Sequence, residues 1–158
     1  MRRKDRAMTD PAELRETILA CDCCRLGLWD EDMGEVYLVP MNFGYEEAGD
    51  TRTFYFHSAR EGRKVDLFRR TGRAGFELDC GHDLVTAAEA CVHSMKYRSV
   101  IGSGRVEFLE GPEEKCHALA QIMAHHTGKS DWTFPAEAMA QLCVFRLTVE
   151  HISGKANR

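Results

Sequence analysis

Residues 51–70 change from a strand pattern to a helix pattern within a few positions, and this change constrains the fold more than any other feature of the chain. Apolar and polar side chains alternate over 51–57, which is typical of a half-buried strand. Ser58 then stands as a candidate helix cap, with Glu61 three positions later in the spacing of a capping box. The sequence therefore predicts a strand that runs directly into a helix over about 59–70.

Further strand and helix signals flank this segment on both sides. Helices are expected to begin near Asp10 and at Gly111-Pro112, and Gly128 is expected to end the second one. Pro40 marks an edge, a bulge or a bend, because proline cannot donate to a strand ladder. Strands are expected over 25–29, 35–45, 73–79, 97–110 and 142–152, and a loop is expected over 81–94. These elements predict an antiparallel barrel with helices packed outside it.

The composition is that of one soluble globular domain. The 158 residues fit a single domain, 1–158, and 44% of them are hydrophobic. No apolar run approaches the ~20 residues of a membrane-spanning helix. The net charge of -4, without a large basic face, argues against nucleic acid as a partner. The basic start of the chain leads into no apolar segment, so residues 1–8 are expected to be a flexible arm rather than a secretory signal.

The seven cysteines are odd in number and follow no signal peptide, so we expect reduced thiols in the cytoplasm. Cys21 and Cys24 have the spacing of a metal or redox site, but a structural zinc site usually needs a second close pair. Two Cys-x-His groups, at 80–82 and 91–93, match no zinc pattern. We therefore predict no metal site and regard the cysteines as small buried side chains.

The start of the helix predicted after Ser58 is a candidate phosphate cradle. Helix starts present free N–H groups and the positive end of the helix dipole. Gly62 would let a ligand approach the backbone, and Arg63 and Lys64 add mobile cations. The alternative is an ordinary cap followed by a solvated basic helix face. The basic residues of this stretch are Arg60, Arg63, Lys64, Arg69, Arg70 and Arg73.

Three segments together resemble the pyridoxamine 5'-phosphate oxidase-like, FMN-binding split-barrel family. They are HSAREGRKVDL at 57–67, VPMNFGY at 39–45 and MKYRSVIGSG at 95–104. Within the family, the chain is most similar to the nitroimidazole-resistance branch, and the resemblance covers nearly the whole chain in order. It implies a mainly β fold, an antiparallel six-stranded split β-barrel of Greek-key type with flanking α-helices. It also implies a homodimer with FMN at the dimer interface.

The resemblance implies three groups of cofactor-binding residues. Those at the ribityl phosphate are His57, Ser58, Gly62 and Lys64. Those beside the isoalloxazine ring, largely through backbone groups, are Val39, Pro40, Met41 and Asn42. Those that approach the flavin from a neighbouring strand are Ser99 and Val100. His57 is also a weak candidate for a proton donor, whereas the paired His125 and His126 are expected to act as cations in the last turn of a helix.

These expectations favour an FMN-dependent oxidoreductase. It would pass a hydride or electrons from a reduced nicotinamide to a small electrophilic acceptor, such as a nitro-aromatic or a quinone. The substrate-binding residues of the true pyridoxamine phosphate oxidases have no counterpart at 151–155, so that substrate is not expected. Two alternatives remain open: a flavin carrier or redox sensor without turnover, and a haem-binding protein on the same barrel. Met41, Phe43 and Tyr45 are expected to be covered by the partner subunit.

Overall fold

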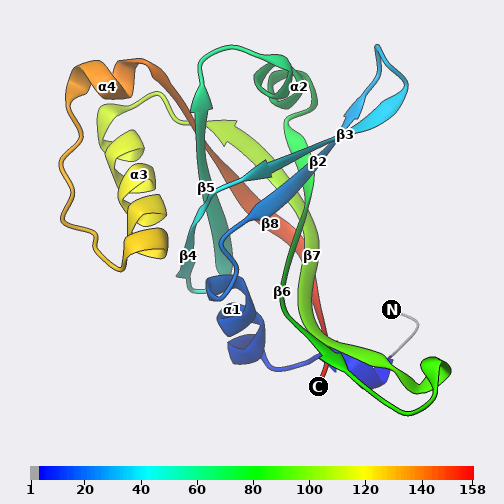
Figure 1. The fold of residues 1–158 in the computed structure, drawn as a ribbon. Coiled ribbons are helices and arrows are strands. Elements are labelled where there is room, and N and C mark those ends of the chain that lie inside the picture. Colours follow the sequence, from blue (N-terminus) through cyan, green and yellow to red (C-terminus); the bar gives the residue numbers. More distant parts are fainter. Residues whose placement is uncertain (1–3) are drawn as a thin grey trace.

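The computed structural model describes residues 4–158, which form one curled antiparallel sheet with helices around it (Figure 1). Short 3-10 turns at Lys4–Arg6 and Ala90–Val92 accompany the regular elements. The helices and strands are, in chain order, β1 (Ala7–Met8), α1 (Pro11–Leu19), β2 (Cys24–Asp30), β3 (Glu35–Met41), β4 (Gly44–Ala48), β5 (Thr51–Ala59), α2 (Arg63–Thr71), β6 (Arg73–Val85), β7 (Ser94–Phe108), α3 (Pro112–Thr127), α4 (Ala136–Ala140) and β8 (Leu142–Asn157).

The sheet has the strand order β3-β2-β6-β7-β8-β5-β4, with β1 paired to β8, and every pairing is antiparallel. The prediction of a mainly β, antiparallel fold with flanking helices is confirmed. The strand number differs, because the described sheet has eight strands and not six. The expected strand over 35–45 is divided into β3 and β4, and β1 is only two residues long. Strands β3 and β4 are the two edges, so the sheet is not closed.

The division between β3 and β4 follows from packing. Phe43 turns inward between the two strands, is fully buried and contacts the ring of Phe54 with centroids 5.5 Å apart. Next to it, a Cβ on Gly44 would lie 2.5 Å from the backbone nitrogen of Ile122 in α3. Only glycine therefore allows α3 to pack this closely on β4.

The core fills the inside of the curled sheet. Phe54, Phe56 and Phe145 are fully buried there, and the rings of Phe56 and Phe145 stack with centroids 5.3 Å apart. Helices α1 and α2 contribute Ile18 and Phe68 to this same cluster, while they lie at opposite ends of the sheet (Figure 1). A smaller cluster lies on the other face of β5 and β8, beneath α3. The helices thus close the ends and one side of the sheet.

The predicted helix boundaries at α1 and α3 are confirmed. Asp10 caps α1, with its Oδ1 accepting from the N–H of Ala12 at 2.9 Å. Gly128 ends α3 in the left-handed conformation, with φ of 73°. Among residues 4–158, no helix is both long enough and apolar enough to cross a bilayer.

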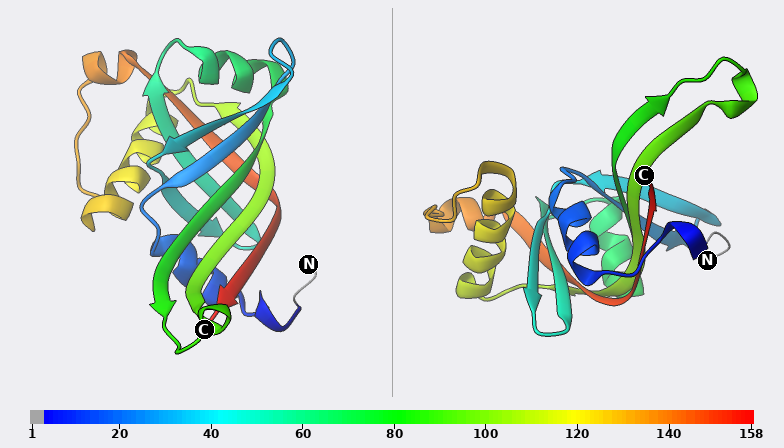
Figure 2. Two further views of the ribbon diagram at one scale, coloured as in Figure 1. Left: turned by 45° about the vertical axis from the view of Figure 1, so that its right-hand side comes forward. Right: turned by 90° about the horizontal axis from the view of Figure 1, so that it is seen from below.

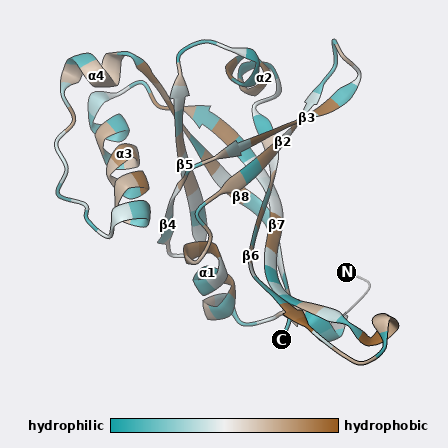
Figure 3. Cartoon of the chain, in the orientation of Figure 1, coloured by the Kyte–Doolittle hydropathy of each residue, from teal (hydrophilic) through white to brown (hydrophobic). Residues whose placement is uncertain are grey.

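Two expected irregular regions take part in the sheet. Of the loop expected over 81–94, residues 81–85 belong to β6 and Ser94 begins β7, while 86–93 connect the two strands at the tip of a ribbon that projects from the body (Figure 2). Leu84 and Met95 expose apolar side chains on it. Hydrophobic positions, coloured brown, lie along this ribbon (Figure 3). Of the expected arm over 1–8, Ala7 and Met8 pair with β8 and Met8 is buried, so this part is not an arm. Residues 1–3 lie outside the described residues.

Candidate functional site

The junction between β5 and α2 differs from the predicted capping box. Strand β5 continues to Ala59, and α2 begins only at Arg63. Ser58 is 7% exposed, pairs with Cys143 of β8, and donates its Oγ proton to the carbonyl of Ala59 at 2.9 Å. Its prediction as the helix cap is therefore wrong, because the ladder with β8 holds it in the strand.

Gly62 occupies the N-cap position of α2. Its φ of 132° and ψ of 163° belong to a region that side-chain-bearing residues rarely adopt. A Cβ built there would meet nothing within 4 Å, so the space above this residue is open. No side chain of the described residues caps the helix. The first N–H groups of α2 are therefore directed at a space that an anion can enter.

Lys64 and His57 both lie close to this helix start. Lys64 is half-buried in the first turn of α2, and His57 stands on β5 two residues before its end. Partial desolvation, together with the charge of Lys64, lowers the pKa of His57. The imidazole is therefore mainly neutral at neutral pH, and it can donate or accept a hydrogen bond beside the ammonium group.

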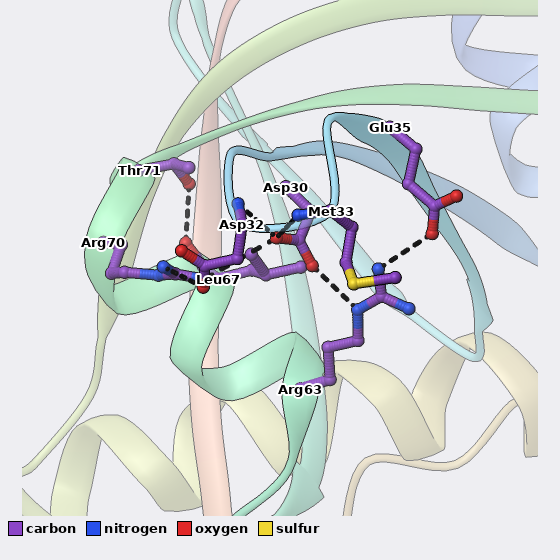
Figure 4. Close-up of polar contacts among 8 residues, drawn as sticks. All are labelled: Asp30, Asp32, Met33, Glu35, Arg63, Leu67, Arg70 and Thr71. Atoms are coloured by element: carbon purple, nitrogen blue, oxygen red, sulfur yellow. Dashed lines mark hydrogen bonds and ion pairs between the residues drawn. The ribbon is translucent and has the colours of Figure 1, made fainter.

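Arg63 is not the mobile cation that the sequence predicted. Its Nε donates to Asp30 at 2.9 Å and its Nη2 to Glu35 at 3.0 Å, which fixes the start of α2 to the β2–β3 turn (Figure 4). Its guanidinium also lies over the ring of Tyr37, 4.7 Å from the centroid. Arg70 reinforces this attachment through Asp32 at 2.7 Å (Figure 4). These contacts hold α2 rigidly against β3, the strand that carries the predicted ring-contacting residues.

Asp30 is the buried anchor of this attachment, with a side chain only 4% exposed. Burial alone would raise the pKa of this carboxyl. The hydrogen bond from Arg63 and those from the N–H groups of Met33 and Asp32 outweigh that effect, so the pKa of Asp30 is lowered. The carboxylate is therefore ionised at neutral pH. Sequence reasoning missed it because Asp30 falls between the strands expected over 25–29 and 35–45, where no motif marks it.

The residues predicted beside the flavin ring lie on or just after edge strand β3. Val39 and Met41 are 8% and 7% exposed and point into the core, so their backbone groups alone could contact a ligand outside the sheet. Pro40 is exposed and pairs with Arg25, and Asn42 is exposed just past the strand end. Pro40 is tolerated because β3 is an edge strand, which confirms one of the alternatives given for it.

Ser99 and Val100 lie in a different part of the sheet. They stand on β7, where Ser99 pairs with Asp79 and Lys155, and Val100 is fully buried. Strand β8 separates β7 from β5. No hydrogen bond or ion pair among residues 4–158 connects this pair to His57, Gly62 or Lys64. Within one chain, the predicted residues on β7 are therefore separate from those at the start of α2.

The outer face of the sheet between these groups was not identified from the sequence. Arg25 on β2 pairs with Pro40, and its Nη1 contacts Glu77 at 3.0 Å and Asp79 at 2.5 Å. Asp79 on β6 in turn pairs with Ser99. Beside this ion group lies a shallow, mainly apolar hollow of about 340 Å³. Its lining residues are Arg25, Gly27, Leu38, Gly75, Phe76, Glu77 and Gly102. Gly27 pairs with Gly75 in its floor, and the side chain of Leu38 lies against Gly27, with Cδ2 3.3 Å from the position of a Cβ there.

The cysteine and histidine groups do not assemble a metal site in the described part of the chain. His82 contacts Asp79 at 2.6 Å instead. Three cysteines are buried, as expected, namely Cys21, Cys24 and Cys143, and burial raises the pKa of Cys21 to about 12. The expectation is wrong for Cys91, which is exposed, and Cys23, Cys80 and Cys116 are only partly buried.

The cationic role expected for His125 is wrong. It is half-buried, its Nε2–H donates to the carbonyl of Cys21 at 2.7 Å, and burial lowers its pKa. A neutral imidazole therefore ties the end of α3 to the segment between α1 and β2.

A curled antiparallel sheet with an uncapped, lysine-bearing helix start at its end defines a split-barrel protein with a candidate anion site. Residues 10–156 match the pyridoxamine 5'-phosphate oxidase family, and the chain belongs to this family. None of the curated proteins matches the chain.

Three solved structures illustrate the relationship. A protein from Bacteroides thetaiotaomicron ascribed to 5-nitroimidazole antibiotic resistance is 34% identical with a TM-score of 0.82, over 96% of this chain and 90% of that chain. An FAD-binding protein from Mesorhizobium loti is 24% identical with a TM-score of 0.69, over 97% and 98%. The FAD and heme binding protein from Mycobacterium smegmatis is 15% identical with a TM-score of 0.79, over 97% and 74%. The last two show the fold alone.

Proposed function

We propose that this protein is a homodimeric, FMN-dependent oxidoreductase. It transfers a hydride or electrons from a reduced nicotinamide donor to a small electrophilic acceptor, such as a nitro-aromatic or a quinone. Membership of the pyridoxamine 5'-phosphate oxidase family and the likeness to a nitroimidazole-resistance protein support this reaction class.

The observation that carries the proposal is the start of α2. Gly62 leaves open space above the first N–H groups of the helix, and Lys64 and His57 stand at its side. A single terminal phosphate fits this arrangement, because N–H groups, helix dipole and ammonium all favour two negative charges at one point. The residues present therefore fit FMN at this point.

Each residue has a definable task toward the bound cofactor. Lys64 neutralises the phosphate, and the N–H groups that follow Gly62 donate to its oxygens. Ser58 uses its hydroxyl within the strand, so it contributes through its backbone. His57, neutral beside Lys64, donates a hydrogen bond from a ring nitrogen. The backbone of Val39, Pro40, Met41 and Asn42 positions the ring system, and Pro40 leaves no N–H there to be satisfied. When bound, the flavin supplies the redox chemistry, and the protein orients it and shapes access to it.

A second copy of the chain completes this site in the proposal. Ser99 and Val100 lie on β7, which β8 separates from β5, and a partner subunit would bring its Ser99 and the backbone of its buried Val100 to the α2 start. The outer sheet face supports this arrangement, because Val36, Leu38 and Ile101 expose apolar side chains on it. Met41, Phe43 and Tyr45, which the sequence assigned to the partner surface, are buried in their own chain and do not contribute.

A cytoplasmic location fits this function. All seven cysteines are free thiols, and a reducing compartment keeps them so. The net charge of -4 gives no reason to expect a nucleic-acid partner.

The deciding experiment identifies the bound chromophore and measures the affinity of the apoprotein for three flavins. FMN should bind much more tightly than riboflavin, which lacks the phosphate, and than FAD, whose phosphate is not terminal. Equal affinity for the three flavins would overturn the single-phosphate site. The absorption spectrum of haem in the purified protein would overturn the assignment of a flavin cofactor. Oxidation of a reduced nicotinamide in the presence of nitro-aromatic and quinone acceptors then separates an enzyme from a carrier.

A further inference from the structure

A small pocket lies between the end of β7, the start of β8 and helices α2 and α3, and the proposed flavin site does not use it. Its volume is about 40 Å³, which gives room for roughly three water-sized groups. Charged side chains from four segments of the chain line it: Arg60, Arg69, Glu110 and Lys115. Three cations and one carboxylate leave it two positive charges at neutral pH.

The three cations lack carboxylate partners. Arg63, Arg70 and Arg73, from the same basic stretch as two of them, each pair with an acidic side chain. By contrast, within residues 4–158, Arg60, Arg69 and Lys115 form no ion pair within 4.0 Å. The paired arginines thus have acidic partners, while these three line the pocket without one.

Buried Cys143 lies among these charges. The residue lines the pocket and is 9% exposed. Burial raises the pKa of this thiol, while the charges of Arg69, Lys115 and Arg60 lower it and that of Glu110 raises it. All four charged groups are therefore close enough to act on the same buried atom.

Two of the cations are also held in place. Arg60 Nη1 donates to the carbonyl of Ala140, the last residue of α4, at 3.1 Å, which leaves its other N–H groups available. The guanidinium of Arg69 lies over the ring of Phe108, 5.4 Å from the centroid. Lys115 stands in the first turns of α3, where the helix dipole disfavours a cation unless an anion is near.

We propose that this pocket is a second anion site, which binds a small tetrahedral oxyanion such as inorganic phosphate. The anion accepts hydrogen bonds from Arg60, Arg69 and Lys115 and so links the β5–α2 junction, α2 and α3. Glu113 and Glu114 of the same α3 turn do not oppose it, because they line a different pocket beside Tyr55 and Arg146. Neither Gly62 nor Lys64 lines this pocket, and Arg60, two positions before Gly62, is the residue that lies nearest in sequence to both sites.

Thermal unfolding of the purified full chain in inorganic phosphate, against potassium chloride at equal ionic strength, tests this site. A ligand that binds only the folded state raises the melting temperature. Phosphate should therefore stabilise the wild type and the control Arg105→Gln, which removes an exposed arginine of β7. Arg69→Gln should weaken phosphate binding about tenfold or more, because it removes a charge-assisted contact. Lys115→Gln should do the same and serves as the second variant if Arg69→Gln folds poorly.

Inorganic phosphate could also bind at the proposed flavin-phosphate site, and two further measurements distinguish the two sites. Lys64→Ala should keep the response to phosphate, and saturating FMN should leave that response in place in the wild type. The proposal is overturned if FMN abolishes the response, if phosphate stabilises Arg69→Gln and Lys115→Gln as much as wild type, or if the wild type does not respond. The melting temperature of Lys64→Ala is measured in inorganic phosphate and without a flavin. The test of the pocket therefore holds even if the flavin assignment fails.

Discussion

Arg63 and Asp30 stand 33 positions apart in the chain, and Arg63 Nε donates to Asp30 Oδ2 at 2.9 Å. The contact joins the start of α2 to the turn between β2 and β3 (Figure 4). It thereby holds the candidate phosphate cradle at a fixed distance from the strand that carries Pro40. The geometry of the proposed flavin site depends on this pair, although neither residue need touch the cofactor.

Asp30→Asn should lower both the melting temperature and the affinity for FMN. Because the folded state lowers the pKa of Asp30, the pair stabilises the protein above the ordinary aspartate pKa of about 4, and this stability is lost as the pH falls through the lowered pKa. The difference between wild type and variant should therefore be largest near neutral pH and shrink in acid. Melting curves across this range, with exposed Asp50→Asn as the control, measure it. A pH-independent difference would show that the charge of Asp30 is not what stabilises the junction.

The sequence predicted the elements whose signal is local. Helix α1 has Asp10 as its cap and α3 has Gly128 as its end, and both boundaries are confirmed. The strand β5 was recognised by its alternation. The helix start was misplaced because Ser58 carries a genuine capping signature, whereas its pairing with Cys143 is a contact across 85 positions that no local pattern reveals.

The composition of the site was predicted in part. Gly62 and Lys64 lie at an uncapped helix start, and their contact with a phosphate stays a prediction. The sequence does not tell which of Arg63 and Lys64 is free to bind a phosphate, because both follow the same glycine. Only the fold brings Asp30 to Arg63. The ribbon over 81–94 was missed because both of its faces are exposed, so its strands lack the alternation that marks a buried face.

Gly62→Ala should weaken FMN binding, whereas Gly49→Ala should not. Both glycines have positive φ, 132° and 59°, and open space where a Cβ would stand. Each substitution strains the backbone, at a cost of about 1–3 kcal/mol. Only Gly62 adjoins the first turn of α2, so only its methyl group would narrow the approach to the phosphate. Titration of both apoproteins with FMN measures this difference. Equal affinities would show that no ligand approaches Gly62.

Leu38→Glu should convert the proposed dimer into monomers. Leu38 on β3 is 68% exposed and Ile101 on β7 is 54% exposed on the outer sheet face, and a carboxylate at Leu38 would be desolvated by a partner. Light scattering at micromolar concentration reads the result directly. Leu19→Glu, on the exposed side of α1, is the matched control because it adds the same charge at an apolar position. If both variants remain dimers, the outer sheet face is not the interface.

His125→Gln should flatten the loss of stability in mild acid. In the wild type, burial lowers the pKa of His125, so the unfolded chain takes up a proton near its ordinary pKa of about 6.5 before the folded state does. Stability should therefore fall as the pH drops below that value. Glutamine can still donate to the carbonyl of Cys21 but does not titrate. Urea midpoints between about pH 5 and pH 7.5 test this, and exposed His93→Gln should leave the wild-type slope unchanged.

Lys64→Ala should weaken FMN binding more than Lys129→Ala. Lys64 stands in the first turn of α2, beside the open N–H groups that follow Gly62. A charge-assisted hydrogen bond from it to the phosphate contributes about 1.5–3 kcal/mol, a change of roughly ten- to hundredfold in the dissociation constant. Lys129 follows Gly128 at the end of α3, where the helix dipole repels anions.

Because each of these two variants removes one positive charge, the comparison holds net charge constant. Riboflavin adds a second control, since it has no phosphate for Lys64 to contact. Lys64→Ala should therefore bind riboflavin as the wild type does while losing affinity for FMN. Wild-type affinity for FMN in both variants would place the phosphate elsewhere. Loss of both flavins in Lys64→Ala would show that this lysine supports the fold of the cradle rather than the phosphate.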